Sequence, residues 1–551
     1  MSNASFQPKL AAQELRAAMR VDPAMRREYE QSGSWANDTL TGWLTANVAR
    51  AGERAVVVTS DGSMSYRELE EKAERFACGL HELGVRSGDV ISVQLPNAGE
   101  FLIAYFGIAR LGAVMSTVHL PYRTSEIRTL LSHSASVAFV GLSAQKDFSP
   151  IAEVLALKRE LPALKHAIAV GDPVEGAVSF GALLDSKAPL PADLSAGPSD
   201  PFLMLFTSGT SAGPKAVPLS YEITLGNARV GAIEHGFQAD DTVLSVSSYT
   251  HLLGLYSLHL ATRVGATNIL FPSYSPADLS AAISRHRPTV LVCAPAHLIG
   301  MMVNGLLEQT DFSSIRLIIT AGSALPPGVA KEVSARLSKG FLTNLWGMTE
   351  LQAGLYTRPG DPFEIATSTS GRVAPGGEIR ITDLSDVPQP VGAEGELQIR
   401  GCLLFPGYYK NDAANRLAFA DGGWFRTGDL AVMDAAGNVR ITGRKTEVIN
   451  RGGMKYNPLD VENILGAHSK VAEVAIVPYP DEILGQRACC FVVPRGRVLP
   501  TLDELCAYLL ERGVSKVKLP ERLEIIEEMP VTPTRKIMRG RLKDLLQGRG
   551  A

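Results

Sequence analysis

The stretch LFTSGTSAGPKAVPLS, residues 205–220, gathers hydroxyls, glycines and one lysine directly after an apolar run that suits a buried strand. Its hydroxyl and glycine positions are Thr207, Ser208, Gly209, Thr210, Ser211 and Gly213. Glycines allow backbone N–H groups to approach an anion closely, and Lys215 adds a positive charge. This composition suits the binding of a polyphosphate, but it also suits a mobile polar loop.

The stretch does not match the Walker-type phosphate loop, which needs a Gly-Lys pair followed by Ser or Thr. Pro214 separates Gly213 from Lys215, and Ala216 follows the lysine. Taken alone, these residues leave both interpretations open, a phosphate-binding loop and a polar surface loop.

Three other stretches carry side chains with possible chemistry: NLWGMTE at 344–350, WFRTGDL at 424–430 and the basic TRKIMRGRLK at 534–543. The carboxylate of Glu350 could ligate a hard cation, and that of Asp429 could accept two hydrogen bonds at once. Each stretch also has an interpretation without chemistry. The Thr-Glu pair in NLWGMTE can start a helix. The Asp and Arg in WFRTGDL can form surface ion pairs, and a basic tail such as TRKIMRGRLK is usually solvated.

The motifs TSGTSAGPK, WGMTE, WFRTGD, ITGRKTEVINRGG and PTRK follow one another in an order and spacing that resemble the adenylate-forming (AMP-binding) superfamily of acyl-CoA synthetases, luciferases and adenylation domains. The resemblance covers the chain from about residue 40 onward. It implies an AMP-forming acid–thiol ligase, which makes an acyl-adenylate from ATP and a carboxylate, releases pyrophosphate, and then transfers the acyl group to coenzyme A.

The resemblance assigns a set of ATP- and AMP-binding positions. They are Thr207, Ser208, Gly209, Thr210, Gly213, Lys215, Gly322, Ser323, Ala324, Trp346, Gly347, Met348, Thr349, Asp429, Arg444 and Lys536. By this assignment, Glu350 ligates Mg²⁺ and Thr349 hydrogen-bonds the α-phosphate. Trp346 replaces the usual Tyr and stacks on adenine, while Asp429 and Arg444 contact the ribose.

The resemblance also implies the catalytic residues. Lys536 matches the mobile lysine that offsets the repulsion between the attacking carboxylate and the α-phosphate. Thr349 and Glu350 complete the set together with His251, which matches a gate position near the channel for the acyl group and pantetheine. A lone histidine is otherwise more often structural.

Coenzyme A binding is assigned to Gly452, Gly453 and Lys455 in NRGGMK. The two glycines would let the thiol arm pass close to the backbone, although a Gly-Gly pair also makes an ordinary turn. Lys455 could attract a phosphate of coenzyme A or face solvent.

Three positions depart from the family pattern. Thr446 replaces the usual Asp or Lys at the hinge, and Arg535 replaces the Gly that usually precedes the catalytic lysine. Met454 and Lys455 replace the commoner Glu-Asn pair after Gly-Gly. The effect of Thr446 on domain rotation, and of Arg535 on the lysine, does not follow from the residue types.

Apolar runs alternate with helical periodicity along most of the chain. RAVVVTS, VISVQL, ASVAFVG, TVLVCA and IRLIIT predict strands, and Ser65 with Glu68 predicts a capping box that opens a helix ending near Gly84. We therefore expect an α/β fold in which a large N-terminal domain, residues 1–443, has parallel-rich sheets covered by helices. The remainder, residues 444–551, predicts a small mobile α+β C-terminal domain on a short hinge.

Composition limits the class of protein. The 551 residues carry a net charge of -3, so we expect no nucleic-acid partner. The six cysteines lack zinc-ligand spacing, which predicts free thiols in a reducing compartment. No apolar secretory segment opens the chain, and Arg110 and Gly112 interrupt the apolar residues 101–120. We expect a cytoplasmic monomer or homodimer without a transmembrane segment.

Two other functions stay open beside an acyl-CoA synthetase. One is an acyl-adenylating enzyme that passes the acyl group to a carrier protein. The other is a catalytically silent acyl- or nucleotide-binding protein, which the presence of Lys215, Glu350, Asp429 and Lys536 disfavours. Because YTHLLGLYSLH and AGSALP carry no obvious charge, the expected substrate is a monocarboxylate with an apolar body, from fatty acid, alicyclic or aromatic acid metabolism.

Overall fold

The computed structural model describes residues 10–19, 21–59, 62–191, 194, 196–207, 214–323, 325–452, 454–532 and 536–548. These residues form an α/β fold with four sheets. The expected fold class is confirmed: a large N-terminal part has parallel-rich sheets, and a small α+β unit follows it. The boundary between 443 and 444, and the mobility of the small unit, stay predictions.

The largest sheet has nine strands within the described ranges, in the spatial order β16-β15-β14-β13-β12-β10-β11-β1-β2. They are β1 (Ala55–Val58), β2 (Ser63–Ser65), β10 (Thr242–Ser245), β11 (Thr267–Ile269), β12 (Val290–Cys293), β13 (Leu317–Ala321), β14 (Phe341–Met348), β15 (Gln352–Tyr356) and β16 (Arg372–Val373). The strands from β14 to β1 pair in parallel. β14 therefore ends at the sheet edge where loops bind ligands, and Thr349 and Glu350 follow it directly.

A second sheet has the order β7-β6-β5-β3-β4-β8-β9. Its strands are β3 (Val90–Gln94), β4 (Val114–Thr117), β5 (Ala138–Leu142), β6 (His166–Val170), β7 (Val178–Ser179), β8 (Pro201–Thr207) and β9 (Lys215–Ser220). All its pairs are parallel except β8 with β9, in which Thr207 lies opposite Lys215. The polar stretch of the sequence therefore connects two antiparallel strands whose ends meet.

The third and fourth sheets are smaller and mostly antiparallel. The third consists of β17 (Gly377–Thr382), β18 (Glu394–Gly401), β19 (Phe419–Ala420), β20 (Trp424–Met433) and β21 (Val439–Arg444). The fourth consists of β22 (Ile449–Arg451), β23 (Met454–Tyr456), β24 (Val471–Asp481), β25 (Gly485–Pro494) and β26 (Arg522–Ile525). The sequence analysis predicted an α+β unit for residues 444–551, which contains the fourth sheet, but it did not predict the strands β17 to β20 of the third.

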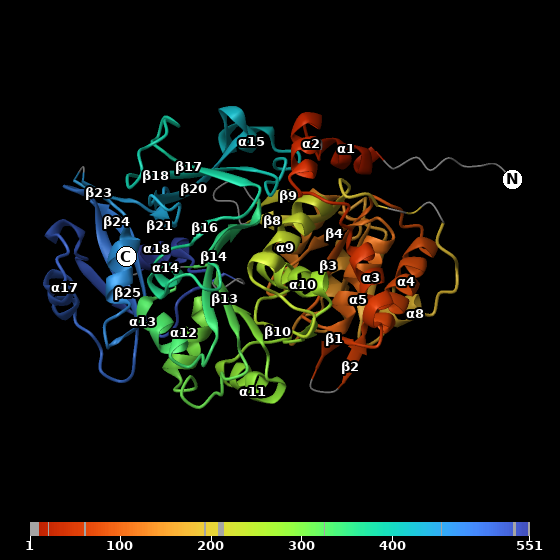
Figure 1. The fold of residues 1–551 in the computed structure, drawn as a ribbon, viewed down its shortest axis with the longest axis horizontal. Helices are drawn as coiled ribbons and strands as arrows, with labels where there is room; N and C mark the ends of the chain where they lie inside the picture. The colour runs from red at the N-terminus through yellow and green to blue at the C-terminus, as the bar shows by residue number, and fades with distance from the viewer. Residues whose placement is uncertain are drawn as a thin grey trace.

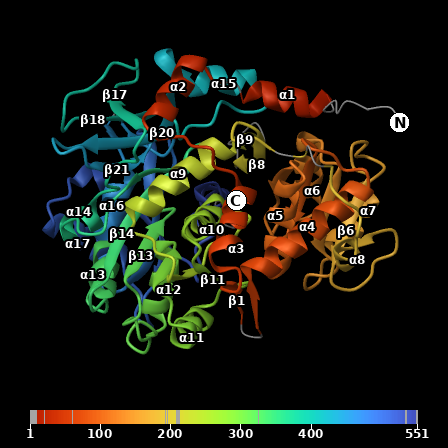
Figure 2. The ribbon, with the colours of Figure 1, turned by 45° about the vertical axis from the view of Figure 1, so that its right-hand side comes forward.

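Helices cover the two large sheets, and the last three helices of the chain pack against the fourth sheet. Their bounds are α1 (Leu10–Ala18), α2 (Pro23–Gln31), α3 (Leu40–Ala51), α4 (Tyr66–Glu82), α5 (Gly99–Arg110), α6 (Thr124–Ser134), α7 (Pro150–Leu157), α8 (Phe180–Leu184), α9 (Tyr221–Glu234), α10 (Leu252–Val264), α11 (Pro276–His286), α12 (Pro295–Val303), α13 (Pro327–Ser334), α14 (Phe363–Ser368), α15 (Asp412–Ala418), α16 (Pro458–Leu465), α17 (Leu502–Glu511) and α18 (Arg539–Gly548), with 3₁₀ turns η1 (Asp421–Gly423) and η2 (Lys516–Lys518). In Figure 1, β24, β25, α17 and α18 lie at one end of the molecule, and α3, α4, α5 and α8 lie at the other. Figure 2 shows α4, α6, α7 and α8 around β6 of the second sheet.

Local signals in the sequence located several helices correctly. Ser65 and Glu68 form the predicted capping box of α4, and Gly84 follows its end with a positive φ of 84°. Thr501 and Glu504 form the same motif at α17. The apolar residues 101–120 form α5 and β4 rather than one long helix, and no helix among the described residues is long and apolar enough to cross a membrane.

Separate hydrophobic cores stabilise the large and the small unit. The main core joins both large sheets through buried side chains of α3, α4, α5, α9 and α10. Two smaller cores are built from residues 449–546, on the two faces of the fourth sheet. All six cysteines are free thiols, and five of them are buried.

A buried ion pair fixes α18 against the fourth sheet. The guanidinium of Arg539 donates two hydrogen bonds to the carboxylate of Glu462, at 2.6 and 2.8 Å, and another to the carbonyl oxygen of Ile476. Arg539 Nε also lies 2.9 Å from the carboxylate of Glu447, just after the predicted hinge. Because Glu462 is only 6% exposed, its charge depends on Arg539 for compensation.

The variant Arg539→Met should lower the free energy of unfolding by about 3 kcal/mol, because it leaves the carboxylate of Glu462 buried without a counter-charge, with only the N–H of Ile476 donating to it. Urea denaturation followed by fluorescence measures this loss. Arg541→Met is the matched control, since Arg541 is 70% exposed and its pair with Asp544 spans 4.0 Å. Equal midpoints for the two variants would contradict the role of the buried pair.

Candidate active site

Asp429 and Arg444 lie opposite each other because β20 and β21 pair in antiparallel register. Arg444 Nε is 2.9 Å from Asp429 Oδ1, and Trp346 Nε1 donates a hydrogen bond of 2.7 Å to Asp429 Oδ2. Both oxygens of this buried carboxylate are therefore engaged and its orientation is fixed. The structure brings together three residues that the sequence analysis assigned to adenine and ribose.

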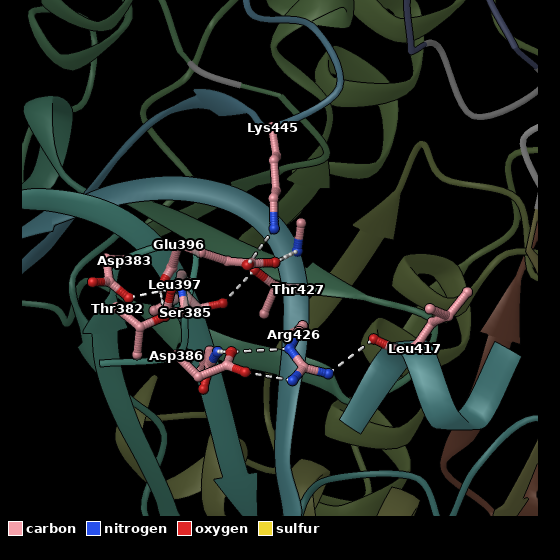
Figure 3. A network of polar contacts seen from close by, with 12 residues as sticks. Thr382, Asp383, Ser385, Asp386, Glu396, Leu397, Leu417, Arg426, Thr427 and Lys445 are labelled. Carbon is pink, nitrogen blue, oxygen red and sulfur yellow. Dashed lines mark hydrogen bonds and ion pairs between the residues drawn. The ribbon is translucent and has the colours of Figure 1, made fainter. Parts of the chain in front are cut away.

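A second carboxylate, Glu396 of β18, holds the loop that carries Asp429. Glu396 is 4% exposed, accepts a hydrogen bond from the N–H of Gly428 at 3.3 Å, and pairs with Lys445 Nζ at 3.0 Å. The N–H of Lys445 in turn donates to the carbonyl oxygen of Gly428 at 2.9 Å. Figure 3 shows Lys445 pointing down onto Glu396, beside Thr427. The sequence analysis missed Glu396 and Lys445, which no linear motif distinguishes from surface charges.

The same loop is fixed from its other side. The hydroxyl of Thr427 donates to the carbonyl oxygen of Leu397 at 2.7 Å and accepts from the N–H of Asp429 at 3.1 Å. Next to it, Arg426 pairs with Asp386 across the sheet (Figure 3). Side-chain contacts on both sides therefore hold the backbone from Arg426 to Asp429.

Glu350 is buried at the end of β14, where Tyr408 donates a hydrogen bond of 2.8 Å to its Oε1. Lys215 Nζ lies 4.7 Å from the centroid of the Tyr408 ring. Burial raises the pKa of Glu350, while the hydrogen bond from Tyr408 and the charges of Lys215 and Lys536 oppose this rise. Tyr408 was not predicted, and its position in FPGYYK offers only an aromatic pair after a glycine as a signal.

Lys536 lies close to Asp429 and Arg444, and also to Glu350. Burial and the neighbouring charge of Arg444 lower its pKa, whereas the carboxylates of Asp429 and Glu350 raise it. Its backbone is fixed by Thr532, whose hydroxyl accepts from the N–H of Lys536 at 3.1 Å. The predicted catalytic lysine thus joins the site from the small unit. The residue pattern alone could not distinguish it from the other basic residues of the tail.

His251 lies at the start of α10, where its Nδ1 accepts a hydrogen bond from the N–H of Leu253 at 3.4 Å. Burial lowers its pKa well below the usual value, and the nearby charges of His119 and Lys536 add to the effect. His251 and Thr349 line one small cavity together with His119, a residue that the sequence analysis did not select. His251 is therefore a neutral imidazole close to Lys536 and to this cavity.

Gly347 is required by the packing of β14 against β15. A Cβ atom at this position would lie 1.8 Å from the carbonyl oxygen of Gln352, at the point where the register of the two strands shifts. The backbone must approach closely here, so only glycine fits. Met348 follows it, and Gly322, whose φ is 97°, and Ser323 follow the end of β13.

Some predicted positions lie outside the described residues: Ser208, Gly209, Thr210, Gly213, Ala324, Gly453 and the side chain of Lys455. Their flanking residues are described. Thr207 ends β8, Lys215 begins β9, and the N–H of Gly452 donates a hydrogen bond of 2.8 Å to Leu484 in the turn between β24 and β25. The assignments of these positions to ATP and coenzyme A stay predictions.

No cluster of three or more metal-ligating side chains occurs among the described residues. Glu350 is the one predicted ligand, and it is a buried carboxylate between the cations Lys215 and Lys536. This donor set does not form a cage for a metal ion. It fits a hard cation that receives most of its oxygen ligands from bound phosphates.

Comparison with known proteins places this geometry in a family. The sequence-family model described as AMP-binding enzyme matches residues 44–409. The family model described as AMP-binding enzyme C-terminal domain matches residues 460–536. The chain is 35% identical over 526 residues to the salicyl-AMP ligase / salicyl-S-ArCP synthetase of Mycobacterium tuberculosis, covering 92% of this chain and 91% of the relative.

Two further similarities cover nearly the whole chain. The salicylyl-CoA synthase / salicylate adenylyltransferase of a Streptomyces species is 30% identical, with 95% of this chain and 96% of the relative covered. The crystal structure of the anthranilate CoA ligase AuaEII with anthranoyl-AMP has a TM-score of 0.86 at 24% identity, over 94% of this chain and 98% of that one, and it confirms the fold. The protein is therefore an enzyme that belongs to the AMP-binding family of adenylate-forming enzymes.

Proposed function

We propose that the protein activates an aromatic carboxylic acid with ATP and passes the acyl group to the pantetheine thiol of a carrier protein. The observation that carries this proposal is the 35% identity, over 92% of the chain, to a salicyl-AMP ligase that is also named a salicyl-S-ArCP synthetase. This relative favours the carrier protein over coenzyme A, which the sequence analysis placed first as the acceptor.

Coenzyme A is the second candidate acceptor. It is supported by the 30% identity to a salicylyl-CoA synthase. Both acceptors present the same pantetheine thiol, so the residues that pass this arm do not separate them. The two acceptors differ in what is attached to this arm. A carrier protein must dock on a surface of the enzyme, whereas coenzyme A must form contacts between its nucleotide and the enzyme.

In the first reaction, an oxygen of the carboxylate forms a bond to the α-phosphorus of ATP while the bond to pyrophosphate breaks. The reacting groups are both anions, so their approach is favoured by cations at the site. Lys536 supplies an ammonium that interacts electrostatically with the carboxylates of Glu350 and Asp429. In this role it stabilises the negative charge on the α-phosphate as the new bond forms.

The other charged residues of the site bind the nucleotide. Asp429, held by Trp346 and Arg444, contacts the ribose, and Lys215 offsets charge on the departing pyrophosphate. Glu350 would hold Mg²⁺, which supplies charge neutralisation to the phosphates. The rise in the pKa of Glu350 caused by burial is consistent with a carboxylate whose cation arrives with the substrate.

In the second reaction, the pantetheine thiolate attacks the acyl carbonyl carbon, a thioester forms and AMP leaves. Lys536 is no longer needed for this step, because pyrophosphate has already departed. We assign its withdrawal to rotation of the small unit about the segment that contains Thr446, as the family resemblance implies. The variant Lys536→Ala separates the two reactions.

The two reactions are tested with the wild type and Lys536→Ala. We expect wild type to release pyrophosphate with ATP, Mg²⁺ and an aromatic acid, and Lys536→Ala to be slower by about 100-fold or more. Both proteins should convert supplied acyl-AMP to the thioester at similar rates. Faster transfer to a holo aryl-carrier protein than to coenzyme A supports the carrier protein as the acceptor. Faster transfer to coenzyme A makes coenzyme A the acceptor. Normal adenylation by Lys536→Ala contradicts the assignment of the lysine.

The lowered pKa of Lys536 predicts a loss of adenylation at alkaline pH. The ammonium form is the active one, so kcat/KM for ATP should fall as pH rises, beginning at a lower pH than a free lysine would give. Lys536→Arg keeps its charge and should move this fall upward in pH, although with a lower rate. Pyrophosphate release measured between pH 6 and about 10.5 gives both profiles. An identical alkaline fall in the two proteins would exclude Lys536 as its source.

Glu396 is proposed as a positioning residue for the Asp429 loop. Glu396→Leu removes both the acceptor for Gly428 and the partner of Lys445, and it should raise KM for ATP about tenfold with little change in KM for the acid. Glu396→Gln retains the acceptor for Gly428 and should restore most of the affinity. Glu394→Gln, an exposed residue of the same strand, is the control. Equal rises in both KM values would indicate a general loss of structure instead.

A further inference from the structure

We propose that His119 recognises a hydroxyl group on the ring of the acid substrate, and that the natural substrate is a single-ring hydroxylated aromatic acid. This inference rests on the proposed function, which supplies the aromatic acid and the adenylation reaction. The inference goes beyond the proposed function by naming the chemical group that the enzyme selects and the residue that selects this group.

The small cavity beside the site, about 10 Å³ in volume, is lined by both polar and apolar side chains. The polar ones are Thr117, His119, Tyr122, Thr250, His251 and Thr349. The apolar ones are Leu130, Leu205, Phe206 and Leu252. A purely aliphatic acid would leave the polar groups without partners, whereas an aromatic ring with a polar substituent can contact both kinds.

The cavity adjoins the reacting atoms. Thr349 lies in the motif assigned to the α-phosphate, and Phe206 directly precedes Thr207 at the start of the phosphate loop. His251 lines the cavity and lies within electrostatic reach of Lys536. We therefore place the carboxylate of the acid toward Lys536 and its ring among the side chains that line this cavity, which must move apart to admit it.

His119 is held in place by two neighbouring groups. Its Nδ1 is 3.0 Å from the hydroxyl oxygen of Thr250, which is 2.8 Å from that of Ser248. The buried amide of Gln94 donates to the carbonyl oxygens of His119 at 2.9 Å and of Tyr122 at 3.1 Å. Both the ring and the backbone of His119 are thus oriented before a ligand binds.

The cavity offers hydrogen bonds but no charge. Burial lowers the pKa of His119 to about 4, so its imidazole is neutral at physiological pH. His251 is neutral for the same reason, and the described residues that line the cavity include no acidic or permanently basic side chain. A second carboxylate on the ring would therefore be buried without a counter-charge, which disfavours it.

The free side of the imidazole has the hydrogen-bonding capacity that a hydroxyl requires. Among the hydrogen bonds of the described residues, His119 uses only Nδ1 of its ring, which leaves Nε2 for a ligand. A neutral imidazole has one donor and one acceptor nitrogen, and its tautomer adjusts to its partners. A phenolic hydroxyl both donates and accepts, so it can pair with Nε2 in either tautomer.

The test compares adenylation of related acids by the wild type and by His119→Phe. The panel is benzoate, its 2-, 3- and 4-hydroxy derivatives, phthalate, 2-aminobenzoate and hexanoate, each with ATP and Mg²⁺, and the readout is kcat/KM from pyrophosphate release. We expect the wild type to prefer one hydroxybenzoate over benzoate by about tenfold or more. His119→Phe keeps a planar ring but no hydrogen bond, and it should reduce this preference to below about threefold while benzoate is still activated.

Two further variants control for loss of structure. His119→Gln retains a donor and an acceptor and should recover part of the preference, whereas a general disturbance of the cavity would not be rescued. His286→Phe, a histidine of α11 outside the cavity, should leave the ratio unchanged. Tyr122→Phe removes the phenolic hydroxyl that lines the cavity and tests whether that residue is the one that selects the substrate.

Each outcome decides the proposal. A hydroxybenzoate preference that is lost in His119→Phe and kept in Tyr122→Phe supports it. A wild-type preference for hexanoate or benzoate, or a hydroxyl preference that survives in His119→Phe, overturns the inference while adenylation itself stands. Release of pyrophosphate with none of these acids overturns both the inference and the proposed function.

Discussion

The desolvation of the Lys536 ammonium is the constraint on which the arrangement of this enzyme depends. A buried cation is stable only if opposite charges lie close to it, and here the carboxylates of Asp429 and Glu350 oppose the effects of burial and of Arg444. Each partner comes from a different sheet. Glu350 follows β14 of the nine-stranded sheet, Asp429 and Arg444 lie on the third sheet, and Lys536 comes from the small unit. The charged cluster therefore exists only when all three are packed together.

The carboxylates of the site do not neutralise its cations fully. Asp429 is shared between Arg444 and the indole of Trp346, and Glu350 accepts from the hydroxyl of Tyr408. Together with Lys215, the cations outnumber these two carboxylates, which leaves an excess of positive charge for a polyphosphate. Glu396 and Lys445 lie nearby, but they pair with each other, so their opposite charges cancel and do not change this excess. The result is a site whose electrostatics are incomplete without an anionic ligand.

The sequence predicted the elements that depend on local signals and the residues that lie in linear motifs. The capping box of α4 was correct because it needs only residues three positions apart, and Glu350, Asp429 and Lys536 were recognised from motif order. Tyr408 and Glu396 were missed because their roles arise from contacts over 58 and 49 residues of sequence separation. Periodicity also failed to predict β17 to β20. In β20, buried and half-exposed residues alternate, which differs from the apolar runs of the parallel strands.

The division of polarity within the site accounts for the orientation of the acid. Charged side chains gather where the phosphates react, whereas the adjoining cavity holds only neutral polar and apolar groups. A carboxylate gains by lying at the charged end, because a buried anion without a partner is strongly disfavoured, and an uncharged ring loses nothing at the neutral end. The two environments meet at Thr349 and His251. Under the proposed function, the charged end would orient the carboxylate of the acid, and the neutral lining that contains His119 would be left to distinguish one acid from another.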